Sequence, residues 1–301
     1  MIRRCIALVV WFGLLASAVV LAPSVWVRAQ EKPPEKPNPS AQEKPPAQVK
    51  PPAPEKQRST DKQVTAEQVA ETAIFWAGRR EGMAQVRKTG IERGRVIRAV
   101  ANGKTEEATY ERRVIRGESM DKDRIRIDQK MPTAEYSLVF AGGQVWGIIN
   151  ESIFTPKLET TQDFLTPQWH GIDTLLRYKE NGSTLNLIGK DKQKGLDLWV
   201  LDVTDKDQRR TRFYVSAKTA RVLWLEYEQR PDSGGDPAKF VRNFHDYHVV
   251  QGTLVPYRTV LYKGGNQIEE THVLTITFGP KIDEALFLNP DTPAPTTASK
   301  P

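Results

Sequence analysis

The sequence predicts an α+β fold that is mainly β, namely a curved antiparallel sheet or half-barrel of about 11–12 strands with covering helices. Three observations predict it. A capped helix opens the folded region, a long series of short alternating segments separated by turn residues follows, and one helical stretch interrupts that series. Regular short strands joined by tight turns favour a sheet that curls into a barrel or half-barrel.

The first helix is marked by its N-terminal cap. Thr65 is followed three residues later by Gln68, which is the spacing of a capping box, and Val64 and Val69 stand where a hydrophobic staple would place them. The helix is expected to run to about Ala77 and to end at Gly78. Its apolar stripe, which is expected to face the core, consists of Ala66, Val69, Ala73 and Trp76.

The strands follow from period-two alternation between turn residues. They are expected over residues 94–101, 106–116, 123–129, 134–141, 144–150, 183–189, 196–203, 209–216, 221–228, 239–249, 253–262 and 268–278. The helical interruption is expected between Gln162 and Tyr178, where apolar residues recur at helical spacing.

Two hairpins supply the candidate residues for a ligand-binding face. The first turns through Gly142-Gly143, which suits positive φ angles, and its residues Tyr136, Leu138, Phe140, Val145 and Ile149 are expected to share one apolar face. Phe140 would pair with Val145 and Tyr136 with Ile149.

The second hairpin turns through residues 217–220. Val215 would pair with Val222 and Phe213 with Trp224, so that these four residues share an apolar face while Leu223 points the other way. The two faces are either the wall of a ligand cavity or ordinary core, and the sequence leaves both interpretations open.

Four segments divide the chain. Residues 1–29 combine a basic start with a long apolar run and predict either a cleaved signal peptide or a retained membrane anchor. Residues 30–62 form a Lys/Glu/Pro-rich linker that is expected to be disordered and extended, as a spacer or as a docking arm. The β domain is expected over 63–290, followed by a disordered tail over 291–301. This organisation predicts an extracytoplasmic, periplasmic location, close to a membrane through the N-terminus.

Charge and cysteine content exclude other classes. The net charge of +7 is spread along the chain, and residues 63–301 hold 34 basic against 32 acidic residues, so a concentrated basic face for nucleic acid is not expected. The only cysteine, Cys5, lies in the predicted signal, so disulfides cannot stabilise the domain and a hydrophobic core must do so.

Three segments in the second half of the domain resemble the LolA/LolB-like family of bacterial outer-membrane lipoprotein-sorting proteins. They are FYVSAKTAR from Phe213, FHDYHVVQGTLVP from Phe244, and the closing IDEALFLNP from Ile282. The order of the segments agrees with the family, whereas Gly279-Pro280 replaces an asparagine that is common before the closing segment. In that segment Ile282 and Phe287 are expected to plug the barrel's edge.

This resemblance implies a curved sheet whose concave, apolar side accepts acyl chains beneath covering helices. The function it implies is an exported carrier or sensor of lipids or lipoproteins, with a lipid-like or acylated ligand and no enzyme activity. The alternative is a noncatalytic interaction module of the cell envelope, in which the interior is packed core and the Pro-rich arm docks an envelope protein.

The sequence predicts no catalytic residue, no metal site and no cofactor. His245 and His248 have the closest spacing to a metal pair, but residues three apart in a strand point to opposite faces. Phe244, Asp246 and His248 are expected on one face of that strand, and His245 and Tyr247 on the other.

Overall fold

Thirteen antiparallel strands pair into one continuous sheet in the computed structural model, which describes residues 64–100, 103–132, 134–230 and 234–289. All of these residues belong to a unit spanning Thr60–Pro301. The predicted signal or anchor, linker and tail lie outside the described residues. The strands are β1 Thr89–Ala99, β2 Thr105–Ile115, β3 Arg124–Lys130, β4 Glu135–Ala141, β5 Gln144–Ile149, β6 Ser152–Phe154, β7 Thr184–Gln193, β8 Leu196–Thr204, β9 Arg210–Ser216, β10 Val222–Gln229, β11 Ala238–Val250, β12 Thr253–Lys263 and β13 Asn266–Phe278.

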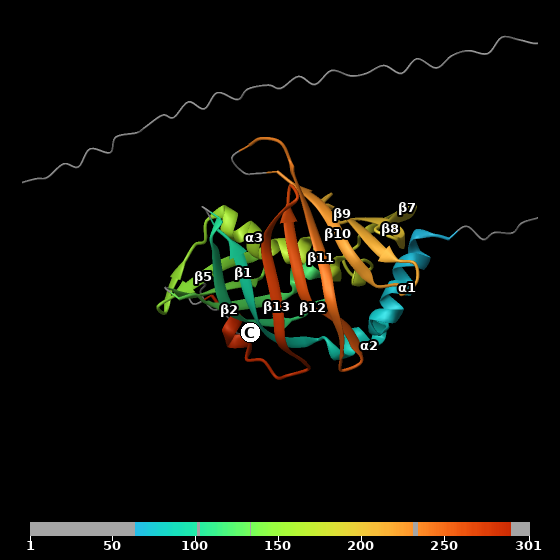
Figure 1. Cartoon of the computed structure of the whole chain (residues 1–301). Coiled ribbons are helices and arrows are strands. Elements are labelled where there is room, and N and C mark those ends of the chain that lie inside the picture. Colours follow the sequence, from blue (N-terminus) through green and yellow to red (C-terminus); the bar gives the residue numbers. More distant parts are fainter. Residues whose placement is uncertain (1–63, 101–102, 133, 231–233, 290–301) are drawn as a thin grey trace, which may run out of the picture. The chain divides into compact units, whose positions relative to one another are not determined.

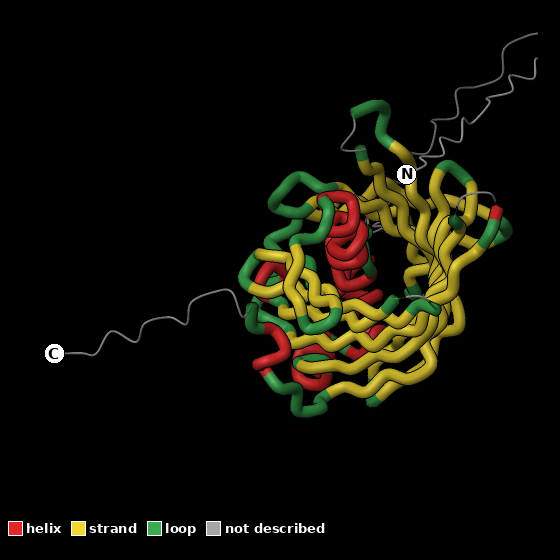
Figure 2. Tube along the Cα trace, turned by 90° about the vertical axis from the view of Figure 1, so that its left-hand side faces the viewer, coloured by secondary structure: helices red, strands yellow, loops and turns green. Residues whose placement is uncertain are grey.

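The strand order is β6-β5-β4-β3-β2-β1-β13-β12-β11-β10-β9-β8-β7. Every neighbouring pair is consecutive in the chain except β1 and β13, which join the two halves of the sheet (Figure 1). The sheet curls around helices on its inner side (Figure 2), so the predicted fold class is confirmed. Only the three-residue strand β6 was not predicted.

The helices lie on the concave side of the sheet. Helix α1 (Ala66–Gly78) begins with the predicted capping box, in which Thr65 Oγ1 accepts from the Gln68 backbone N–H at 3.2 Å. A second short helix, α2 (Arg80–Val86), was not predicted because its sequence contains Gly82 and buries only Met83. The stretch predicted between Gln162 and Tyr178 forms two helices, α3 (Leu158–Trp169) and α4 (Ile172–Leu176).

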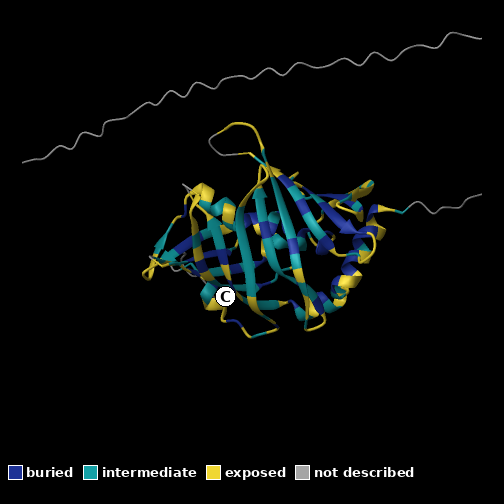
Figure 3. Cartoon of the chain, viewed as in Figure 1, coloured by how far each residue is buried: buried dark blue, intermediate teal, exposed yellow. Residues whose placement is uncertain are grey.

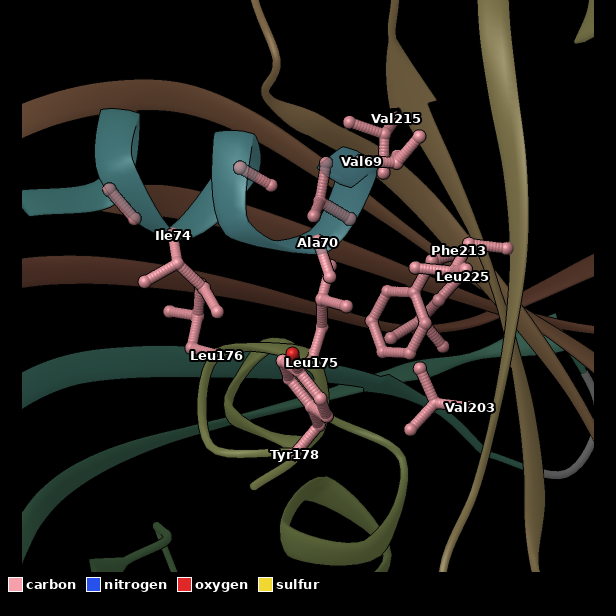
Figure 4. Packing of buried hydrophobic residues seen from close by; sticks show 14 of the residues in the cluster. Val69, Ala70, Ile74, Leu175, Leu176, Tyr178, Val203, Phe213, Val215 and Leu225 are labelled. Carbon is pink, nitrogen blue, oxygen red and sulfur yellow. The ribbon is translucent and has the colours of Figure 1, made fainter. Parts of the chain in front are cut away.

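The largest core cluster lies under α1 (Figure 4). Val69, Ala70 and Ile74 of the helix pack against α4 and against the inner face of β8–β10. The strands contribute residues that are fully or almost fully buried, namely Leu201, Val203, Phe213, Val215 and Leu225. Buried residues are dark blue in Figure 3. Burying each such large side chain contributes about 1.5–3 kcal/mol, so this cluster stabilises the part of the sheet that packs against α1.

The closing segment packs on the opposite side. Ile282 and Phe287, the latter in the 3-10 turn η3 (Glu284–Phe287), form a cluster with Ile115, Val139 and Trp146. The expectation that Ile282 and Phe287 plug the edge of the barrel is therefore wrong. They cover the outer face of β2–β5, which is apolar because Val139 and Trp146 alternate with the inward residues of the same strands.

The first predicted hairpin has the expected register. Phe140 pairs with Val145 around the turn at Gly142 and Gly143, whose φ angles are 58° and 78°. The observed ladder ends at Ser137 and Ile148, so Tyr136 and Ile149 occupy the next position outward. The sequence did not show that both faces of this hairpin are buried.

The second hairpin departs from the prediction. Val215 pairs with Val222 as expected, but a β-bulge between Val222 and Trp224 shifts the register, so that Phe213 pairs with Leu225. Trp224 pairs with Tyr214 and stacks on its ring at 4.7 Å on the outer face. The pairing of Phe213 with Trp224 was wrong because an extra residue in one strand reverses the alternation beyond it.

A further reversal occurs in β11. Asp246 has a φ of 51°, and Phe244 and Tyr247, three residues apart, both pack against the core under α1. The expected alternation, with Phe244 and Tyr247 on opposite faces, is wrong because the left-handed residue between them turns the strand. The Tyr247 hydroxyl donates to the Val222 carbonyl at 2.6 Å, which ties β11 to β10.

The end of α1 generates one prediction. Gly78 has a φ of 131°, and a Cβ there would lie 2.9 Å from the Gly252 carbonyl oxygen in the β11–β12 turn. Gly78→Ala is expected to lower the free energy of unfolding by about 2 kcal/mol, because it adds both backbone strain and a clash with backbone atoms. Urea unfolding measures the change.

Gly82→Ala is the matched control. It lies in α2 with nothing within 4 Å of the added carbon and is expected to be neutral or stabilising by up to about 1 kcal/mol. Equal effects of the two substitutions would show that the contact between α1 and the β11–β12 turn contributes nothing.

His170, which follows α3, generates a second prediction. Its ring stacks on Tyr227 at 4.2 Å, and its Nδ1 lies 2.7 Å from Thr211 Oγ1. Burial, helped by Arg209 and Arg242, lowers the pKa of His170 from its usual 6.5 to about 3. Below pH 6.5 the His170 ring therefore binds a proton in the unfolded chain but not in the folded chain. Its contribution to stability is complete above that pH and is lost as the pH falls towards 3.

Between pH 7 and pH 5 this one group is expected to lower the free energy of unfolding by about 2 kcal/mol. His170→Gln keeps a polar side chain beside Thr211 and removes the titration. Urea unfolding at several pH values should therefore show a shallower loss of stability in the variant. Identical pH slopes in the two proteins would contradict the assignment.

Candidate functional site

A cavity of about 650 Å³, partly open to solvent, lies on the concave side of the sheet. The inner face of β1–β4 and β10–β13 forms its wall, and α3 and α4 contribute the side chains that cover it. Its volume lies within the range of about 300–1,000 Å³ that is usual for ligand sites. It exists because α1 fills the concave side only beneath β7–β12, where the core cluster lies.

The middle of the cavity wall is apolar. Ile127 on β3 faces Leu138 on β4 across the ladder, and Val96 on β1 lies on the same face of the sheet. Phe164 and Ile172 lie opposite them, on α3 and α4. The other half of the sheet contributes Phe240, Phe244, Leu261, Val273 and Ile276. Such a wall favours the burial of an aliphatic or aromatic group.

One end of the cavity, called here the floor, lies beside α2 and α4 and is lined by Arg87, Arg112, Arg116, Asp123 and Asp173. Asp173 forms ion pairs with Arg116 and, at 3.7 Å, with Arg87. Burial would raise the pKa of Asp173, but the surrounding arginines outweigh it and hold that pKa well below its usual range. Asp173 therefore stays ionised.

A second ion pair, between Arg177 and Asp123, lies at the floor. Arg177 Nη1 donates to Asp123 Oδ2 at 2.7 Å, and Arg177 Nη2 donates to the Gly117 carbonyl at 3.0 Å. Both side chains are buried, so breaking the pair would leave an uncompensated charge in the interior. The pair ties α4 to the loop between β2 and β3.

The other end of the cavity, called here the far end, is lined by Arg98, Gln129, Tyr136, Asp163 and Glu269. Arg98 Nε donates to Glu269 at 2.9 Å, and the Tyr136 hydroxyl donates to Gln129 Oε1 at 2.6 Å. Burial, together with Glu159 and Glu269, raises the pKa of Asp163. The far end thus has an acidic character that the floor lacks.

The nine residues predicted from the hairpins lie in five different places. Tyr136 and Leu138 line the cavity. Phe140 and Val145 pack on the same inner face against Leu165 of α3, and Ile149 is 38% exposed at the end of β5. The rest of the predicted set is divided between the core under α1 and the outer face, with Phe213, Val215 and Val222 in the former and Trp224 in the latter.

The charged lining was not predicted. Tyr110, Arg112, Val114 and Arg116 are alternate residues along and just after β2, and all of them line the cavity. The available signal was that this strand carries polar side chains on both faces, which is unusual for a strand with one face towards a core. Arg87 and Asp173 lie far from β2 in the sequence, so no local pattern could have placed them beside it.

Neither a metal site nor a membrane-spanning helix is found in the part of the chain that the structure describes. There, no three His, Cys, Asp or Glu side chains come close enough to hold a metal ion. His248 instead stacks on Tyr257 at 4.4 Å, and His245 pairs across the ladder with Arg258. The helices in these ranges are too short or too polar to cross a bilayer.

Several solved structures share this architecture. A LolA superfamily protein from Nitrosomonas europaea superposes with a TM-score of 0.52 at 12% identity, over 75% of this chain and 98% of that one. A domain described as an outer membrane lipoprotein-sorting protein, from Vibrio parahaemolyticus, gives 0.50 at 13% identity, over 72% and 97% of the two chains. A DUF1329 family protein from Desulfovibrio piger gives 0.52 at 13% identity, over 73% and 97%.

No protein-family model and no curated protein matches the sequence. At identities this low, the structural matches define the fold alone. That fold is a half-barrel with its cavity on the concave side. The chain has the LolA-like fold, and the resemblance read from its three sequence segments is confirmed at that level.

Proposed function

We propose that this protein is an exported carrier or sensor that binds the acyl chain of a lipid or lipoprotein in the concave cavity. The observation that carries the proposal is the apolar wall of a cavity of about 650 Å³. Burying an aliphatic chain contributes about 0.8 kcal/mol per methylene, so about ten buried methylenes would supply about 8 kcal/mol before the cost of association. The fold of the matched structures supports the same function.

The proposal extends to the location and organisation of the chain. The predicted signal or anchor would place the domain outside the cytoplasm, and the Pro-rich linker would hold it away from the membrane surface. No enzyme activity is part of the proposal. Tyr136 and Leu138 are the predicted ligand-binding residues that line the cavity and would contact the chain.

The alternative is a noncatalytic interaction module of the cell envelope. It is favoured by Phe75 and Trp76 on α1, which are 52% and 62% exposed and contact each other edge to face at 6.0 Å. The prediction that Trp76 faces the core with Ala66, Val69 and Ala73 is therefore wrong. Neighbouring exposed aromatic residues are typical of protein interfaces. The two functions differ in whether an acylated molecule co-purifies with the protein.

Native mass spectrometry of the full chain, purified from an extracytoplasmic fraction without detergent, distinguishes them. A co-purifying acylated species, identified after lipid extraction, is expected. A ligand-free mass, together with no uptake of any acyl ligand on titration, would contradict the carrier function and favour the interaction module.

The cavity wall generates a matched pair of variants in β13. Ile276 lines the cavity, whereas Leu274, two residues away, is 62% exposed because a β-bulge in the β1–β13 pairing separates them. Ile276→Trp is expected to weaken binding of a fluorescent neutral acyl probe at least about tenfold by filling the cavity. Leu274→Trp adds the same group outside it and is expected to leave binding unchanged.

Fluorescence titration of both variants tests this expectation, with thermal unfolding as the check that each is folded. Equal affinity in the two variants would show that the probe does not occupy this cavity.

A further inference from the structure

The floor of the cavity carries an excess of positive charge. Four arginines surround it, against three carboxylates, namely Arg87, Arg112, Arg116 and Arg177 against Glu92, Asp123 and Asp173. Ion pairs among these residues tie α2 and α4 to the sheet and so give three of the four arginines a structural role. Arg112 is the exception.

Arg112 lines the cavity, and its charge contributes to the low pKa of Asp173, but within the described residues it has no hydrogen-bond or ion-pair partner. Its neighbours on the same face, Tyr110 and Val114, also line the cavity. Glu92 lies opposite Arg112 across the β1–β2 ladder, but that carboxylate accepts from the Tyr110 hydroxyl at 2.8 Å. The guanidinium therefore has donors to offer to a ligand.

A second arginine at the floor also has an unused donor. The Arg87 side chain is only 6% exposed, and its Nη2 donates to the Leu254 carbonyl at 2.9 Å. Its Nε is buried without a hydrogen-bond partner in the described part of the chain. Burial lowers the pKa of Arg87 to about 10, which still leaves it charged at neutral pH. A buried donor without an acceptor is costly, and an anion at the floor would relieve that cost.

The far end of the cavity would repel the same anion. Arg98 is already paired with Glu269 there, and Asp163 lies near Glu159 and Glu269. Glu92 and Arg98, which lie on β1 near the two ends, are six residues apart, so the ends are separated by about 20 Å along the strand. The electrostatic field thus gives an amphiphile one preferred direction in the cavity.

We infer that the floor is an oxyanion site, in which Arg112, with Arg87 beside it, receives the phosphate or carboxylate head of an acyl ligand whose chain lies along the apolar wall. This inference rests on the proposed acyl-binding function and specifies the ligand class as an anionic amphiphile. Guanidinium groups suit this role because their planar donors match the oxygens of both anions.

The test compares three ligands that share one chain and differ in the head: dodecyl phosphate, dodecanoate and dodecanol. Each displaces a fluorescent neutral acyl probe from the full-length protein, and the dissociation constants are compared. The wild-type protein is expected to bind the two anions at least about tenfold more tightly than the alcohol, as a charge-assisted hydrogen bond would provide.

Arg112→Met is expected to remove this preference by weakening the binding of the two anions, and Arg112→Lys is expected to keep part of it. Arg95→Met is the control, because it removes the same charge from the outer face, where Arg95 is paired with Glu107 at 3.5 Å. It is expected to bind all three ligands as the wild type does. Thermal unfolding checks that each variant is folded.

The outcomes separate the two proposals. Equal binding of all three ligands by the wild type, a comparison that needs no variant, would overturn the oxyanion site and leave acyl binding intact. So would a preference that survives in Arg112→Met. Failure of all three ligands to displace the probe, or failure of the probe to bind, would overturn the proposed function itself.

Inorganic phosphate, titrated alone by calorimetry, distinguishes the source of the anion. Binding much weaker than that of dodecyl phosphate is expected, because the free ion lacks the chain. Equal affinity would overturn the head-group assignment and indicate a site for the free ion.

Discussion

The pairing of β1 with β13 is the constraint on which the rest of the structure depends. It joins strands separated by more than half of the domain and turns two series of hairpins into one sheet. A sheet of this width twists and coils because of its chirality, so one side becomes concave and must be covered. Helices α1, α3 and α4 cover that concave side, and the cavity is the part of it that they leave unfilled.

The two halves of the sheet are covered differently. Under α1, small side chains such as Ala70 and Ala73 let the helix approach the sheet closely, and large buried residues of β8–β10 fill the space. Elsewhere on the concave side, α4 is held partly by ion pairs at the floor, and side chains do not fill the space between the sheet and α3 and α4. The concave side is therefore packed core beneath α1 and a cavity beneath α3 and α4.

The polarity of the cavity follows from this mode of attachment. Asp173 on α4 attracts arginines from α2 and β2, and their combined charge exceeds what the local carboxylates neutralise. The same residues that fix the helix therefore create a field at one end of an apolar space. An amphiphile with an anionic head is the ligand that uses both properties, and binding it requires no catalytic group.

The sequence by itself determined the local features. Thr65 and Gln68 specified the start of α1, Gly142-Gly143 specified a hairpin and its register, and period-two alternation located twelve of the thirteen strands. It also predicted Tyr136 and Leu138 as cavity residues, because alternation identifies the apolar face of a strand. What only the tertiary structure decided was the bulge that turns Trp224 outward, the reversal at Asp246, and the meeting of Arg87, Arg112 and Asp173. Bulges depend on how a strand fits its neighbours, and the charged floor depends on the contact of segments remote in the chain, so neither leaves a local pattern in the sequence.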